Sequence, residues 1–139
     1  MKDELILALR GGVIGSITIE SSSEEKFQNQ TLRPILKIQN DLLLLVFKNY
    51  ITKQKVDFAA LSPEKKMQFI ENAIQRDIKF RNSLKGMIIG FFTLLEYETY
   101  IQNSSNLNKR MMNLLIERYK SQIQIIKKWT HCFKSSYYF

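Results

Sequence analysis

Apolar side chains recur three and four residues apart along most of the chain, the spacing that places them on one face of a helix. The pattern begins near Ser22 and predicts four helices. The first runs from Ser22 past Pro34 to Ile51, the second from Ser62 to about Gly86–Gly90, the third from Thr93 to near Asn103, and the last from Ser104 or Ser105 to about Lys128. The sequence therefore predicts an all-α fold, a compact bundle of about four helices.

Three of these helices have recognisable starts. Ser22 or Ser23 can cap the first helix, with Glu24 and Glu25 following in its first turn. Ser62-Pro63-Glu64 places proline at the first helical position, where its missing N–H costs nothing. Thr93 and Glu96 have the spacing of a capping box, in which each side chain bonds the other's backbone amide.

The pattern divides the chain into an irregular N-terminal arm (residues 1–22), the helical bundle (residues 23–129) and an aromatic, basic tail (residues 130–139). The arm contains a cluster of glycines, and Ile17-Thr18-Ile19 alternates with the period of a strand. A single strand has no sheet to join, so we expect an arm that docks on the bundle.

The first helix is apolar on almost every side between Leu42 and Phe47. A helix of this kind is normally surrounded by protein. We therefore expect it at the centre of the bundle or in the interface of a homo-oligomer, and a purely structural homo-oligomer is one candidate function.

Four charged residues fall on the apolar faces of their helices: Asp77, Arg81, Glu98 and Arg118. Asp77 and Arg81 are four residues apart, so they share one face. Unpaired buried charges are costly, and we expect the two acids and two arginines to pair. The cluster is either a structural salt-bridge network or a small polar pocket whose arginines grip a carboxylate or phosphate, and the latter predicts a small-molecule-binding bundle.

Composition adds a basic character that is not evenly spread. The 139 residues have a formal net charge of +8, but residues 104–139 hold seven Lys and Arg against one acid, so they carry +6 and residues 1–103 only +2. On the last helix Lys109, Arg110, Lys120, Lys127 and Lys128 share an outward face with Asn113 and Gln124, and aromatic residues follow. Such a stripe is either a solvated surface or the footprint of an anionic partner. Nucleic acid or a ribonucleoprotein is the leading candidate partner, ahead of an acidic protein or an anionic membrane.

Catalytic and metal-binding patterns are scarce. The chain has one histidine, His131, and one cysteine, Cys132, side by side in the tail. One cysteine cannot form an internal disulfide, and repeated metal-ligand spacings are absent. We expect no cofactor and no metal site, and the residues favour a non-enzymatic interaction protein. The chain contains neither a signal-peptide pattern nor an apolar run of about 20 residues, so we expect a cytoplasmic protein without a transmembrane segment.

The stretch from Ala73 to Tyr97, AIQRDIKFRNSLKGMIIGFFTLLEY, together with FQNQTLRPILKIQNDL before it, resembles a short uncharacterised bacterial family whose members often carry the automatic label glyoxalase. The resemblance covers about residues 24–128 and carries no active-site motif. Glyoxalase-type enzymes resemble paired βαβββ modules with histidine and glutamate metal ligands, a pattern from which this helical, histidine-poor chain departs.

Overall fold

The computed structural model describes residues 1–18, 21–124 and 126. Its α-helices are α1 (Lys2–Arg10), α2 (Ser23–Phe27), α3 (Arg33–Ile38), α4 (Asn40–Lys53), α5 (Pro63–Gln75), α6 (Ile78–Ile89), α7 (Leu94–Gln102) and α8 (Ser104–Ser121). One π-helical turn, Gln28–Leu32, joins α2 to α3, and one 3-10 turn, Phe58–Ala60, precedes α5. No strand occurs among these described residues. The all-α prediction is confirmed, while the expected number of about four helices is too low.

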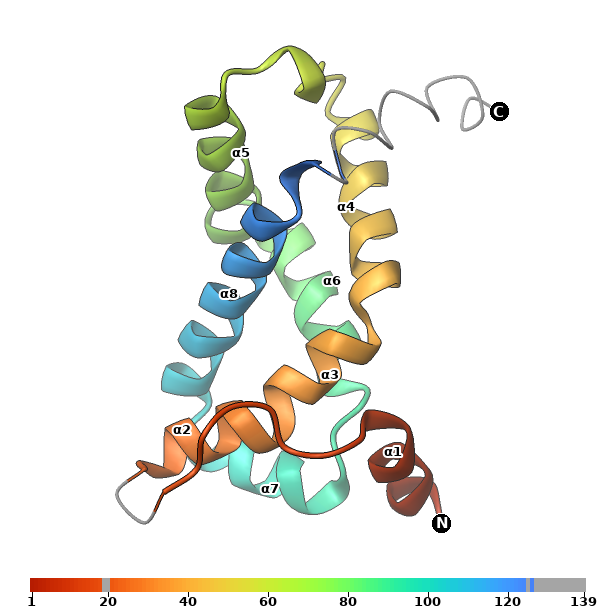
Figure 1. Ribbon diagram of the computed structural model, residues 1–139, viewed down its shortest axis with the longest axis vertical. Coiled ribbons are helices and arrows are strands. Elements are labelled where there is room, and N and C mark those ends of the chain that lie inside the picture. Colours follow the sequence, from red (N-terminus) through yellow and green to blue (C-terminus); the bar gives the residue numbers. More distant parts are fainter. Residues whose placement is uncertain (19–20, 125, 127–139) are drawn as a thin grey trace.

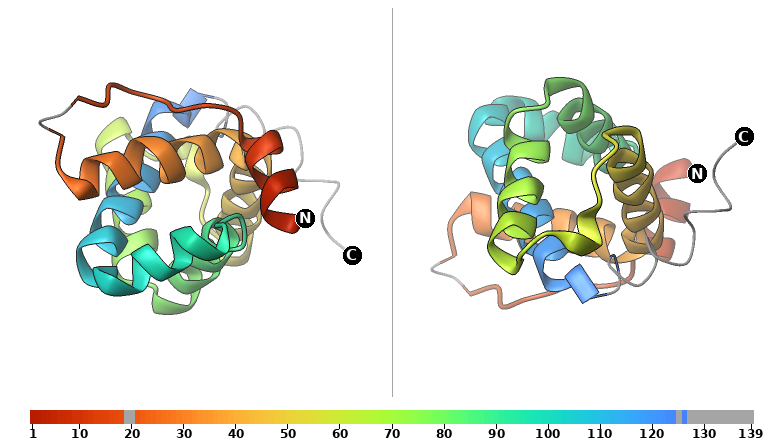
Figure 2. Two further views of the ribbon diagram at one scale, coloured as in Figure 1. Left: turned by 90° about the horizontal axis from the view of Figure 1, so that it is seen from below. Right: turned by 90° about the horizontal axis from the view of Figure 1, so that it is seen from above.

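The longer helices lie lengthwise and the shorter ones close one end. Figure 1 shows α4, α5, α6 and α8 along the long axis, with α1, α7 and the α2–α3 segment across the lower end. Viewed along that axis, the helices surround a common interior (Figure 2). The centre of the core is aromatic: the Phe47 ring stacks on the Tyr119 ring at a centroid distance of 4.5 Å and contacts Phe58, Phe69 and Phe80. The last helix, α8, buries Leu107, Met111, Leu114, Leu115 and Tyr119 against this core.

The first predicted helix bends, but not at its proline. Helical structure continues from Ser23 through the π-helical turn to Pro34, and the Gln30 carbonyl, four residues before this proline, accepts from Arg10 in place of the missing N–H. The bend occurs at Gln39, whose φ of −89° and ψ of 2° lie outside the helical region. Figure 1 shows α4 turning sharply away from α3 at this point.

The second predicted helix is two helices, because Asp77 interrupts it. Asp77 has an extended backbone, and its carboxylate accepts the backbone N–H of Phe80 at 3.2 Å as the cap of α6. The preceding helix, α5, starts with the predicted Ser62 cap. An aspartate placed four residues before an arginine predicted an ion pair on a continuous helix. It is instead a start signal, since a short acceptor side chain satisfies the amides at a helix N-terminus.

The expectation of an irregular arm over residues 1–22 is wrong for its first half, where α1 forms. Arg10, at the end of α1, is 6% exposed and donates to the backbone carbonyls of Phe91 and Gln30. The Ile14 N–H donates to the Asn29 carbonyl at 3.0 Å, so the irregular part that follows also contacts the bundle. The arm therefore docks on the body through hydrogen bonds to residues far away in the sequence.

Helix α4 is not enclosed on all sides. Leu42 is 48% exposed and Leu45 39% exposed, and with Val46 they line a shallow apolar hollow of about 280 Å3. This face does not fit a helix at the centre of the bundle, while the alternative, an interface of a homo-oligomer, stays a prediction. Within the described residues, no helix is both long and apolar enough to cross a membrane.

Candidate functional site: a basic pocket between α6 and α8

A pocket of about 490 Å3 lies where α6 and α8 meet the end of α5. Its cationic residues are Arg81 and Lys85 from α6 and Lys109 from α8. The remaining lining residues are Ile74, Gln75, Ser105, Asn108, Met112 and Asn113. None of the described residues that line this pocket is acidic. Three positive charges without a neutralising carboxylate make a local field that attracts anions.

Helical spacing directs these side chains into the same hollow. Arg81 and Lys85 are four residues apart on α6, while Ser105, Lys109 and Asn113 follow one another at intervals of four on α8. Side chains four apart lie on one helix face. The pocket is therefore walled by one polar stripe from each helix, and the largely buried Met112 adds an apolar contact, with fully buried Ile74 behind it.

Two neighbouring contacts orient the polar groups. The Arg81 guanidinium donates to the Gln75 backbone carbonyl at 3.0 Å, which holds it at the junction of α5 and α6. The Tyr100 hydroxyl donates to the Asn108 side-chain oxygen at 2.5 Å, so the Asn108 amide keeps its N–H groups as donors. Within the described part of the chain, the side chains of Lys85, Lys109 and Asn113 form no hydrogen bond or ion pair.

The four residues predicted to form a polar core cluster, Asp77, Arg81, Glu98 and Arg118, do not come together. No ion pair joins any two of them in the described residues. Asp77 caps α6, Arg81 lines the basic pocket and Glu98 is exposed on α7. The inward face of α7 is the Glu96 side, because the capping box turns that carboxylate toward the body, and Leu94, Glu98 and Ile101 consequently face outward.

Arg118 lies apart from the acids and near another cation. Its guanidinium donates to the Asn40 side chain at 3.0 Å. Burial, followed by the charge of nearby Arg33, lowers the pKa of Arg118 below its usual value. A guanidinium remains protonated at neutral pH despite such a shift. Arg118 is therefore a half-buried cation held by an amide.

The predicted basic stripe of Lys109, Arg110, Lys120, Lys127 and Lys128 is only partly available to a partner. Lys109 is exposed and lines the pocket. Arg110 forms an ion pair with Glu24 at 3.4 Å and donates to Gln28, and Lys120 pairs with Glu71. Lys127 and Lys128, with the aromatic tail, lie outside the described residues. Lys85, which the stripe did not include, lines the pocket with Arg81, four residues before it.

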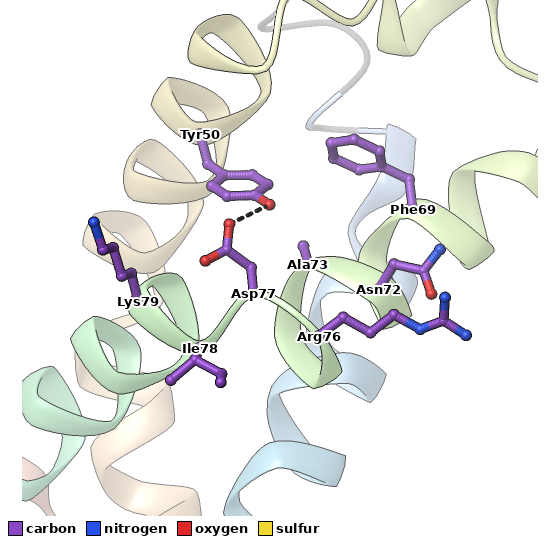
Figure 3. Close-up of a pocket in the computed structure, with 8 residues that line it drawn as sticks. All are labelled: Tyr50, Phe69, Asn72, Ala73, Arg76, Asp77, Ile78 and Lys79. Carbon is purple, nitrogen blue, oxygen red and sulfur yellow. Dashed lines mark hydrogen bonds between the residues drawn. The ribbon is translucent and has the colours of Figure 1, made fainter.

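A second hollow, of about 510 Å3, lies beside the α5–α6 junction, lined by Tyr50, Phe69, Asn72, Ala73, Arg76, Asp77, Ile78 and Lys79. The Tyr50 hydroxyl donates to the Asp77 carboxylate at 2.9 Å. Figure 3 shows this bond at one side of the hollow, with the Arg76 side chain extending away from it. Burial, then the hydrogen bond to Asp77 and its charge, raise the pKa of Tyr50 to about 12. Both oxygens of Asp77 already accept hydrogen bonds, which makes this pair a structural support for the α6 cap.

An ionic cluster centred on Glu96 joins α1 to α7. Arg10 donates to both oxygens of Glu96, at 2.5 and 2.8 Å, and the Thr31 hydroxyl and Thr93 amide donate to the same carboxylate. Burial alone would raise the pKa of Glu96, but the hydrogen bonds from Arg10, Thr31 and Thr93 outweigh it and lower that pKa. All its acceptor positions are used internally. This cluster therefore holds the N-terminal helix in place.

No group of three or more His, Cys, Asp or Glu side chains gathers within the described residues in a way that could hold a metal ion. Comparison with protein-family models, with curated proteins and with solved structures finds no match for this chain. The resemblance to the glyoxalase-labelled family remains a prediction.

Proposed function

We propose that this protein binds an anionic partner, with nucleic acid as the leading candidate, through α8 and the facing side of α6. The observation that carries the proposal is the pocket in which Arg81, Lys85 and Lys109 converge without an acid. Lysine and arginine charges account for most nucleic-acid affinity, because they displace counterions from phosphates. The amides and the hydroxyl beside them are further donors of the kind that contact phosphate and sugar oxygens.

Fluorescence anisotropy with a labelled oligonucleotide tests this function. Reversing two pocket charges, Lys85→Glu with Lys109→Glu, is expected to weaken binding by at least about tenfold at moderate salt, since it replaces two attractive charges by repulsive ones. The dependence of log affinity on log salt concentration is expected to become shallower by about one to two units.

A matched control separates the pocket from the overall charge. Lys53→Glu with Lys65→Glu makes the same change in net charge at exposed positions outside the pocket. Screening limits its effect to about twofold, because charges beyond roughly 8–10 Å act weakly at physiological salt. Equal losses in both double variants, or no binding of nucleic acid by the wild-type protein, would overturn the proposal.

A second candidate is self-association through α1 and α7. The Asp3 carboxylate accepts the Leu94 N–H at 3.2 Å and so brings the starts of the two helices together. The two helices expose several large apolar side chains: Leu5, Leu7, Leu9, Leu94, Leu95, Tyr97 and Ile101. Clusters of exposed apolar residues mark interaction sites more often than scattered ones do. This surface favours a homo-oligomer, although through other helices than the Leu42–Phe47 region of the sequence-based hypothesis.

A further inference from the structure

The basic pocket is larger and more varied than a phosphate group requires. Its volume of about 490 Å3 falls within the range of roughly 300–1,000 Å3 that small-molecule sites occupy. Besides its three cations it contains the amides of Gln75, Asn108 and Asn113. A site for phosphate alone needs positive charge and N–H donors, because phosphate oxygens accept hydrogen bonds. Amide acceptors and an apolar surface would not contribute to binding phosphate.

Two apolar residues line the pocket, Ile74 and Met112. Ile74 is fully buried and lies behind the wall, while Met112 is 9% exposed, so the apolar contact comes from Met112, which the core holds in place. A methionine thioether is polarisable and packs well against aromatic rings. Asn113 extends the same polar stripe as Lys109 on α8. A flat ring in the pocket can therefore contact apolar Met112 and the Asn113 amide, and Asn113 lies one helical turn from the cation Lys109.

Asparagine and glutamine match the edge of a nucleobase such as adenine, since each presents a donor and an acceptor together. We propose that the pocket takes one nucleotide unit of a single-stranded nucleic acid, with its phosphate on the Arg81, Lys85 and Lys109 side and its base over Met112 toward Asn113. This inference rests on the proposed function and specifies the state of the nucleic acid. A duplex keeps its bases stacked and paired, whereas an unpaired nucleotide can turn its base into a protein pocket.

The experiment compares three labelled ligands of equal length: a single-stranded oligonucleotide, the same backbone without bases, and the matched duplex. The wild-type protein is expected to bind the single strand at least about fivefold more tightly than the abasic strand, because the abasic strand lacks the base that contacts Met112 and Asn113. Unlabelled single strand is also expected to displace the labelled duplex from the protein at lower concentration than unlabelled duplex does. A free mononucleotide serves as a further competitor, and its inhibition at high concentration would locate recognition in the nucleotide unit itself.

Variants assign the base contact to the pocket. Asn113→Ala is expected to reduce the preference for the single strand over the abasic strand while leaving abasic affinity within about twofold, since it removes no charge. Gln68 is an exposed amide on α5 outside the pocket, so Gln68→Ala is the matched control. It is expected to leave the affinity for both strands unchanged. The double variant Lys85→Glu with Lys109→Glu is expected to lower the affinity for the single strand and for the abasic strand by a similar factor.

The possible failures are distinguishable. Equal affinity for the single strand and the abasic strand, or tighter binding of the duplex, overturns the nucleotide inference and leaves nucleic-acid binding standing. An Asn113→Ala variant that keeps the full preference also overturns it, because the base is then recognised elsewhere. Absence of binding to all three ligands overturns the proposed function as well.

Discussion

Glu96 shows how much depends on which donors surround one side chain. It serves the capping box of α7 and at the same time receives Arg10 and Thr31. Glu98, two residues later, is exposed and contributes to neither. Removing one member of a buried ion pair costs far more than removing an exposed charge, because the remaining partner keeps its desolvation penalty.

Stability should depend on pH through Glu96. Its pKa is lowered in the folded protein, so its contribution is complete above the ordinary value near 4.5 and is lost as pH falls through the folded value. Urea unfolding between about pH 6 and 3 is expected to show a decline in the free energy of unfolding that is shallower in Glu96→Gln. Glu98→Gln, on the same helix, is the control and should follow the wild type. If the free energy of unfolding of Glu96→Gln fell with pH as steeply as that of the wild type, Glu96 would not be the source of the pH dependence.

Asp77 is a second single residue with a large structural effect. Its role follows from its extended backbone and from the two hydrogen bonds that its carboxylate accepts. Asp77→Ala is expected to lower the free energy of unfolding by about 1–2 kcal/mol, through loss of the α6 cap. Asp77→Asn keeps a cap acceptor and should cost less, and Tyr50→Phe should cost about 1 kcal/mol for its single bond. Thermal and urea unfolding measure these values. Equal costs for Ala and Asn would exclude the capping role, and none of the three changes should weaken binding at the basic pocket.

At the scale of helices, the sequence is most informative where a start signal is local. The Ser22, Ser62 and Thr93 caps all form as predicted, because each needs only a side chain and an amide three residues away. Asp77 is missed because its neighbours also fit a continuous amphipathic helix. The residue directly after the break, Ile78, is 61% exposed, although Phe80, Leu84 and Ile88 further along α6 are buried. Periodicity identifies helices but does not fix their phase across such a break.

The candidate site was harder to predict, because it depends on two helices meeting. Lys109 was identified from the basic stripe of α8, and Arg81 from its unusual place on the apolar arc of α6. Their common pocket, and the inclusion of Lys85, follow from packing between segments that are far apart in the sequence. The neutralisation of Arg110 by Glu24 and of Lys120 by Glu71 is equally non-local. Counting charges along the sequence therefore overestimates the positive charge that a basic helix has available for binding a partner.

At the scale of the whole molecule, the two proposed surfaces belong to different helices. The basic pocket is formed by α5, α6 and α8, whereas the exposed apolar side chains lie on α1 and α7. Because they share no residue, nucleic-acid binding and self-association can be tested separately.

Sedimentation velocity over a concentration series tests self-association. The wild-type protein is expected to shift from monomer to dimer as concentration rises, since burying exposed leucines releases about 25 cal/mol per Å2 of apolar surface. Leu5→Lys with Leu94→Lys should keep it monomeric. Leu42→Lys, on the exposed face of α4, is the control and should leave the dimer unchanged. A wild-type protein that stays monomeric at every concentration would exclude a homo-oligomer.

The long-range anchoring of α1 also determines when during synthesis the fold can be completed. The partners of Arg10 at Phe91 and Glu96 follow it by 81 and 86 residues. A ribosome adds about 5–20 residues per second, so the first helix waits roughly 4–16 seconds before its anchors have been made. During that interval Ile6, the buried apolar side chain of α1, has no complete bundle to pack against. Helix α1 is translated well before its anchors and is consequently among the last parts of the fold to reach its final position.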